Sequence, residues 1–165
     1  MHLDAEAICA AILHDVGKIG VEEGVVGKLG PLSQDETRGM RHHPEIGARI
    51  LSPLSSLHGV GLYVRHHHEH YDGSGYPDGL QGDKIPLPSR IILLADAFDA
   101  MTTDRPYREA LTRKETFQRI REGRGKQFDP KIVDIFFALD AEGYIDDIYG
   151  KDQDEFPEEV QPSGA

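Results

Sequence analysis

The chain lacks most features that mark secreted, membrane-spanning or nucleic-acid-binding proteins. It has no tryptophan and a single cysteine, Cys9, so no disulfide can form within it, and we expect a reducing, cytoplasmic setting. Cys9 stands in an apolar segment, where we expect a buried small side chain. No apolar run reaches membrane-spanning length, and no signal peptide precedes the first motif.

Basic residues are also scarce. The chain has 18 Lys and Arg against 29 Asp and Glu, a formal charge of −11. This balance argues against a partner such as long DNA or RNA, which requires a basic face. Residues 140–159 hold nine acidic residues and one basic residue. The remainder is therefore close to charge balance, and a small phosphate ligand is compatible with it.

Strand-period alternation is absent, and apolar residues recur at helical spacing, so we predict an all-α fold. The expected helices cover 4–16, 33–42, 44–51, 57–70, 89–101, 113–122 and a segment from 129 onward. Ser33 and Glu36 have the spacing of a capping box, and the glycine-containing stretches 19–32 and 72–88 are expected loops. For 89–101, the adjacent isoleucines alone would also permit a strand. We expect one domain over 1–148 and an acidic, disordered tail over 149–165.

The densest chemical signal is the group of four histidines at positions 66, 67, 68 and 70. The metalloprotease pattern His-Glu-x-x-His is not met, because the fifth residue from His68 is Asp72. We favour His67 and His68 as metal ligands, and His66 and His70 as surface groups or partners behind the ligands. An exposed, histidine-rich helix end remains the alternative.

Three other positions are candidate metal ligands. His14 and Asp15 stand together at a helix end, a pair that suits divalent metals, although a helix-terminal histidine with a capping aspartate explains it equally well. His43 precedes a proline-led helix and gains weight only from the other histidines, while His42 is expected to be solvated. Asp96 follows the most apolar run, where an acid is costly to bury unless paired or metal-bound; a single polar stripe is the alternative.

Phosphate-binding groups accompany these ligands. Lys18 lies three residues after Asp15, and Arg105 and Arg108 flank a Pro-Tyr pair. Arginine makes bidentate contacts to phosphate and to guanine, although surface arginine pairs are common. The glycines at 73, 75, 79 and 82 form no Walker loop, because no Gly-Lys-Ser/Thr follows. We expect them to let the backbone turn sharply beside a ligand.

Together these residues resemble the HD-GYP family, a branch of the HD phosphohydrolase superfamily. The resemblance covers about residues 5–140 and rests on motifs in a fixed order. They are His14-Asp15-x-Gly17-Lys18, His43-Pro44-x-x-Gly47, His67-His68-Glu69-x-x-Asp72-Gly73-x-Gly75-Tyr76-Pro77, Ile85-Pro86, Arg90-Ile91, Asp96-x-x-Asp99-Ala100, Arg105-Pro106-Tyr107-Arg108 and Phe128-Asp129-Pro130.

The resemblance implies a helical HD bundle with a C-terminal extension that hydrolyses cyclic di-GMP to the linear dinucleotide or GMP. Hydroxide activated at a two-metal centre would do this chemistry, with iron or manganese favoured and zinc, nickel or magnesium also possible. The implied metal ligands are His14, Asp15, His43, His67, His68 and Asp96. Asp15 would bridge the metals, and Lys18 would contact the scissile phosphate or the attacking water. The implied substrate-binding residues are Lys18, Gly75, Tyr76, Arg105 and Arg108.

The sequence departs from the family pattern at its start. Family members carry a helix before the His-Asp pair that supplies a further ligand histidine, whereas His2 and Glu6 lie too close to His14 to match. We therefore expect that the first helix is missing or that the chain was cut from a longer protein. The surface left exposed would suit an upstream receiver or sensor domain, or a dimer partner.

Three functions therefore compete. The first is a cyclic di-GMP phosphodiesterase. The second is a catalytically impaired module that binds cyclic di-GMP or regulates through an incomplete centre. The third is an HD phosphohydrolase for another nucleotide, which ranks last because the Gly75-Tyr76-Pro77 loop is present.

Overall fold

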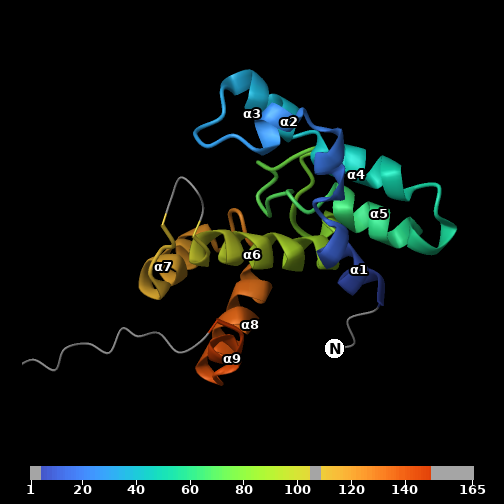
Figure 1. Ribbon diagram of the computed structural model, residues 1–165. Helices are drawn as coiled ribbons and strands as arrows, with labels where there is room; N and C mark the ends of the chain where they lie inside the picture. Colours follow the sequence, from blue (N-terminus) through green and yellow to red (C-terminus); the bar gives the residue numbers. More distant parts are fainter. Residues whose placement is uncertain (1–4, 105–108, 150–165) are drawn as a thin grey trace, which may run out of the picture. The chain divides into compact units, whose positions relative to one another are not determined.

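The computed structural model describes residues 5–104 and 109–149, and every regular element in these ranges is a helix (Figure 1). The prediction of an all-α fold is therefore confirmed. The α-helices are α1 (Ala5–Leu13), α2 (Glu23–Val26), α3 (Gln34–Met40), α4 (His43–Leu51), α5 (His58–Arg65), α6 (Leu87–Thr102), α7 (Arg113–Gly123), α8 (Pro130–Ala141) and α9 (Tyr144–Tyr149). Three short 3-10 helices are η1 (Val16–Gly20), η2 (Ser55–Leu57) and η3 (Gly82–Lys84).

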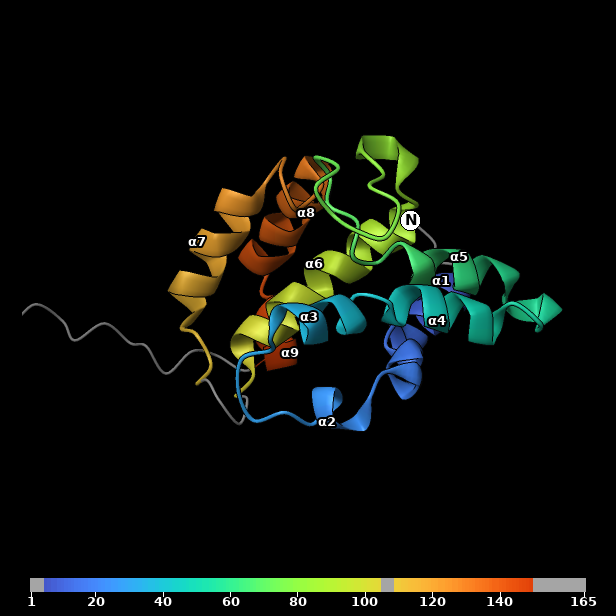
Figure 2. The ribbon, with the colours of Figure 1, turned by 90° about the horizontal axis from the view of Figure 1, so that it is seen from above.

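The chain divides into two compact units, Met1–Val133 and Asp134–Ala165. In the first unit, α4 and α5 lie side by side, and α1 packs against α5 (Figures 1 and 2). Their shared core consists of Ala10, Leu51, Val60, Val64 and Ile92. Burial of these side chains holds the end of α1, the start of α4 and the end of α5 close together.

One local prediction is confirmed and two are wrong. Ser33 accepts from the backbone N–H of Glu36, and the Glu36 carboxylate accepts from the N–H of Ser33, which completes the predicted capping box. The helix expected over 57–70 ends at Arg65. His67 and His68 therefore lie in a turn, where helical spacing no longer fixes their directions. The short helix α2 falls in a segment predicted as loop.

Close backbone packing joins η1 to α4. A Cβ on Gly17 would overlap the carbonyl oxygen of His43 and lie 2.5 Å from the amide nitrogen of Gly47. Glycine at this position therefore allows the His-Asp segment to approach the start of α4. Cys9 is half-buried beside the core rather than fully buried as predicted.

The second unit contains the remainder of α8, together with α9. Gly143 follows α8 with φ of 84°, a left-handed conformation that glycine adopts without strain. The predicted disordered tail over 149–165 lies almost entirely outside the described residues. Among the described residues, none of the helices has the length and apolar character needed to cross a membrane.

Candidate metal centre

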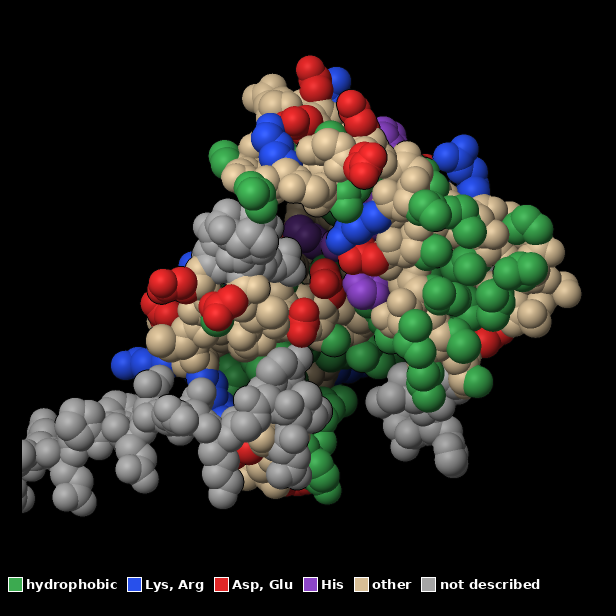
Figure 3. Space-filling view, viewed as in Figure 1, with side chains coloured by type: hydrophobic (Ala, Val, Ile, Leu, Met, Phe, Trp, Pro, Cys, Tyr) green, Lys and Arg blue, Asp and Glu red, His purple; other side chains and the backbone are tan. Residues whose placement is uncertain are grey.

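Three histidines converge within the first unit. His43 opens α4, and His67 and His68 follow α5. One ring nitrogen from each lies within 4.8 Å of the others, and the Nε2 atoms of His43 and His67 are 3.3 Å apart. His43 and His67 are buried, at 2% and 0% exposure. Figure 3 shows histidine side chains in a hollow that acidic and basic side chains surround.

Backbone carbonyls fix the tautomers of three of the predicted ligand histidines. The Nδ1 atoms of His14, His43 and His67 lie 2.8, 2.8 and 2.6 Å from the carbonyl oxygens of the residues three positions earlier. A carbonyl oxygen only accepts, so each Nδ1 carries the proton and each Nε2 presents a lone pair. This arrangement is typical of metal-ligating histidines.

The donor set fits a divalent cation. With both Nδ1 atoms donating, the facing Nε2 atoms of His43 and His67 bring two lone pairs together, which is unfavourable unless a cation lies between them. Metal–nitrogen bonds of roughly 2.0–2.1 Å place neighbouring ligands roughly 3 Å apart, as this pair is. These side chains could therefore hold a shared ion.

Burial keeps the histidines neutral. It lowers the pKa of His67 to about 3 and that of His68 to about 2, and it also lowers the pKa of His43. Neutral imidazole is the form that binds metal. The site therefore presents its lone pairs at neutral pH.

Asp15 lies between His43 and His14. Its Oδ1 is 3.3 Å from His43 Nε2, and its Oδ2 is 3.5 Å from His14 Nε2. Lys18 donates from Nζ to Oδ2 at 2.6 Å. Burial raises the pKa of Asp15, but Lys18 and the neighbouring histidines lower it further than burial raises it. The carboxylate is thus ionised and lies close to imidazoles on both sides, which is compatible with the predicted bridging role.

Asp96 approaches the same group from α6. Its Oδ1 lies 3.8 Å from His14 Nε2, and its side chain is 32% exposed. The rings of His14 and His67 are 5.2 Å apart. The structure therefore brings the six predicted metal ligands together: His14, Asp15, His43, His67, His68 and Asp96.

The predicted Gly75-Tyr76 loop forms a wall of this centre. The Tyr76 ring stacks on His68 at 5.0 Å between centroids, and the Tyr76 N–H donates to the His68 carbonyl at 3.2 Å. Burial raises the pKa of Tyr76 to about 12, so it stays neutral. A Cβ on Gly75 would overlap the backbone of His68 and His70, so only glycine allows this approach.

Sequence reasoning missed the role of Glu69. This carboxylate is 1% exposed and accepts from the N–H groups of Asp78 and Leu80 at 2.7 and 3.0 Å. It thereby holds the loop that carries Tyr76 against the turn that contains His67 and His68. The sequence did carry a signal for this role. Glu69 directly follows the predicted ligand His68, and a carboxylate buried there requires hydrogen-bond donors.

Replacing Glu69 with glutamine should loosen this loop. The amide group would face one of the two backbone N–H donors, leaving it unpaired, which costs about 1–3 kcal/mol. Urea unfolding measures the loss, with Glu23→Gln on the exposed surface of α2 as the control. Equal stability of the two variants would contradict this role for Glu69.

His66 is not the surface group that the sequence suggested as one alternative. It is 6% exposed, and its ring nitrogens lie 2.9 Å from the Leu62 carbonyl and 2.9 Å from Asp78. Arg65 donates to both oxygens of Asp78 at 2.9 and 2.7 Å. Although His66, Glu69 and Asp78 cluster closely enough to hold an ion, both carboxylates already have donors. We therefore assign them to loop support.

Four other residues considered in the sequence analysis are His70, Lys18, Arg105 and Arg108. His70 is half-buried, with Nδ1 3.0 Å from the Ser74 hydroxyl. Lys18 is 39% exposed, so a ligand can reach its ammonium group. Arg105 and Arg108 lie outside the described residues, so their predicted substrate contacts stay predictions.

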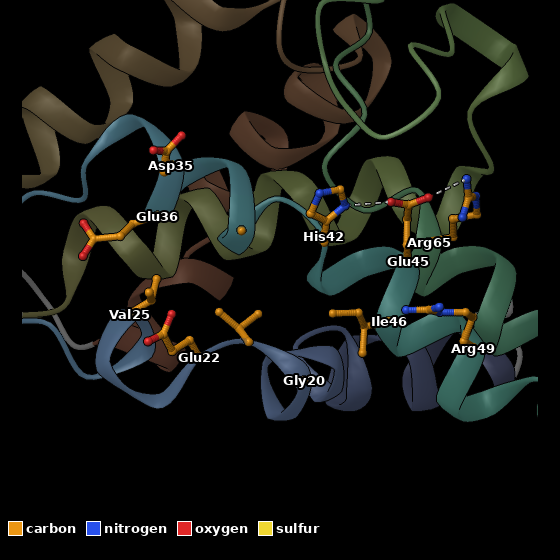
Figure 4. A pocket seen from close by; sticks show the side chains of 12 residues that line it. Gly20, Glu22, Val25, Asp35, Glu36, His42, Glu45, Ile46, Arg49 and Arg65 are labelled. Carbon is orange, nitrogen blue, oxygen red and sulfur yellow. Dashed lines mark hydrogen bonds and ion pairs between the residues drawn. The ribbon is translucent and has the colours of Figure 1, made fainter.

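A separate groove of about 700 Å³ lies along α2, α3 and α4 (Figure 4). Figure 4 shows His42, Glu45 and Arg65 in a row, joined by ion pairs of 3.1 and 3.3 Å. His42 is 59% exposed, which confirms the prediction that it is solvated. None of the predicted site residues lines this groove.

The helical bundle and its histidine–aspartate cluster define an HD-type domain. The model of the family described as "HD domain" matches residues 2–132, so the chain belongs to the HD domain family. Its resemblance to the HD-GYP branch agrees with its curated relatives. Cyclic di-GMP phosphodiesterase response regulator RpfG of Xanthomonas campestris is 46% identical over 76% of this chain and 34% of that protein. A cyclic di-GMP phosphodiesterase of Thermotoga maritima is 41% identical over 88% of this chain and 40% of that protein.

Other relatives carry a different substrate in their names. A 3′3′-cGAMP-specific phosphodiesterase 2 of Vibrio cholerae is 38% identical over 76% of this chain and 24% of that protein. A solved cyclic GMP-AMP-specific phosphodiesterase from V. cholerae has the same fold, with a TM-score of 0.63 and 22% identity over 84% of this chain and 38% of that chain. The chain thus spans well under half the length of these relatives.

Proposed function

We propose that this domain is a metal-dependent phosphodiesterase that hydrolyses cyclic di-GMP to linear pGpG or GMP. The observation that carries the proposal is the convergence of His43, His67 and His68, with Asp15 beside His43 and the Tyr76 ring stacked on His68. A metal centre of neutral imidazoles and a shared carboxylate suits phosphodiester hydrolysis. Relatives named for cyclic di-GMP support the choice of substrate.

Individual residues would divide the work as follows. Two divalent ions held by His14, Asp15, His43, His67, His68 and Asp96 would supply positive charge to polarise a phosphoryl oxygen and acidify water. The Lys18 ammonium has three donors and uses one on Asp15, so it can also bind a phosphate oxygen. Tyr76 would form the wall of the substrate site beside His68. Arg105 and Arg108 would add contacts to guanine or phosphate.

The upstream context is part of the proposal. We expect the domain to act in the cytoplasm, either downstream of a receiver or sensor domain in the same chain or together with a dimer partner. The relative named a response regulator supports this arrangement. Iron or manganese suits the mixed His/Asp ligands better than a closed zinc site would.

Turnover of cyclic di-GMP with Mn²⁺ or Fe²⁺ tests the proposal. We expect pGpG or GMP to form. EDTA should abolish the reaction and added Mn²⁺ should restore it, because the proposed role of the histidines is to bind the metal. The same assay is run with 3′3′-cGAMP and with a mononucleotide, and chromatography of the products shows which substrate is hydrolysed fastest. Binding of cyclic di-GMP without product would favour the impaired binding module instead.

A further inference from the structure

One cation lies beside the metal centre and belongs to none of the family motifs quoted above. The guanidinium carbon of Arg41 is 5.2 Å from the centroid of the Tyr76 ring. Tyr76 in turn stacks on His68. The guanidinium therefore lies one aromatic ring beyond His68, a predicted metal ligand.

The donors of Arg41 are available to a ligand. Arg38 and Arg65 each form an ion pair with a carboxylate, whereas Arg41 has no such partner among the described residues and is exposed. Its backbone is well placed, because the carbonyl of the preceding Met40 binds the Nδ1 of His43. The position of Arg41 is thus tied to the metal centre while its five N–H donors stay open.

We propose that Arg41 selects guanine in the cyclic dinucleotide that binds beside Tyr76. An arginine fork donates to both O6 and N7 of guanine, whereas adenine offers N7 beside an amino group that cannot accept. The cation–π contact with the Tyr76 ring holds the guanidinium beside the centre, while its N–H donors stay available to a base. This inference rests on the proposed function and adds a residue that would distinguish cyclic di-GMP from its adenine analogues.

Equilibrium binding tests the inference separately from catalysis. We would titrate cyclic di-GMP and cyclic di-AMP calorimetrically into the full chain treated with EDTA, so that neither ligand is hydrolysed. The wild-type chain should prefer cyclic di-GMP roughly tenfold to hundredfold. Arg41→Ala should remove most of that preference by weakening cyclic di-GMP alone. Arg38→Ala, on the exposed surface of α3, is the matched control and should keep the preference.

A lysine substitution separates guanine recognition from simple attraction to phosphate. Lysine keeps the charge but loses the fork, so Arg41→Lys should behave like Arg41→Ala. Restored affinity in Arg41→Lys, an equal loss for both ligands in Arg41→Ala, or no preference in the wild-type chain would each overturn the inference. Absence of turnover with intact selective binding would instead count only against the proposed hydrolysis.

Discussion

Replacing Asp15 with alanine should empty the metal centre. The carboxylate lies 3.3 Å from His43 and 3.5 Å from His14, so its removal takes a ligand from both sides of the cluster. Loss of a partner behind a ligand alone costs roughly 10–100-fold in metal affinity, and loss of a shared ligand should cost more. The Asp15→Ala variant is incubated with Mn²⁺, passed over a gel-filtration column and analysed for metal. Its metal content should be as low as that of the wild-type chain after EDTA treatment.

Asp35→Ala is the control for this result. Asp35 is 88% exposed and pairs with Arg38 on the surface, so its removal should leave the metal content unchanged. Folding should survive in the Asp15 variant, because a half-exposed ion pair contributes about 1 kcal/mol or less. Normal metal content in a folded Asp15→Ala variant would refute the assignment of the centre.

Gly17→Ala should have the largest effect on stability. The new methyl group would overlap the carbonyl of His43 and crowd the amide of Gly47, so η1 would have to move away from α4. Overpacking of this kind costs about 3 kcal/mol or more, which corresponds to a fall in melting temperature of roughly 10 °C for a chain of this size. Because Asp15 and His43 would separate, metal affinity should fall as well.

Gly24→Ala provides the comparison within the same segment. A Cβ there meets nothing within 4 Å, and alanine favours the short helix α2 by about 1 kcal/mol. Its melting temperature, followed by circular dichroism, should match or exceed the wild-type value. Equal melting temperatures for the two variants would mean that η1 and α4 are not packed as described.

The local pattern was sufficient for most of the helices. Apolar periodicity indicated α1 and α8, Pro44 indicated the start of α4, and the Ser33–Glu36 spacing indicated the start of α3, because these signals involve residues within a few positions of each other. It was not sufficient for the end of α5 at Arg65, since a helical pattern continues into the histidines. Contacts with the loop near Asp78 compete with the helix there.

The sequence by itself determined which side chains could bind a metal, because ligand type and order are covalent properties of the chain. Only the tertiary structure decided how they meet. The 3.3 Å approach of His43 to His67 and the loop support by Glu69 join residues 24 and 9 positions apart. Such contacts depend on how α4 and α5 pack their apolar faces, and no short-range pattern encodes that register.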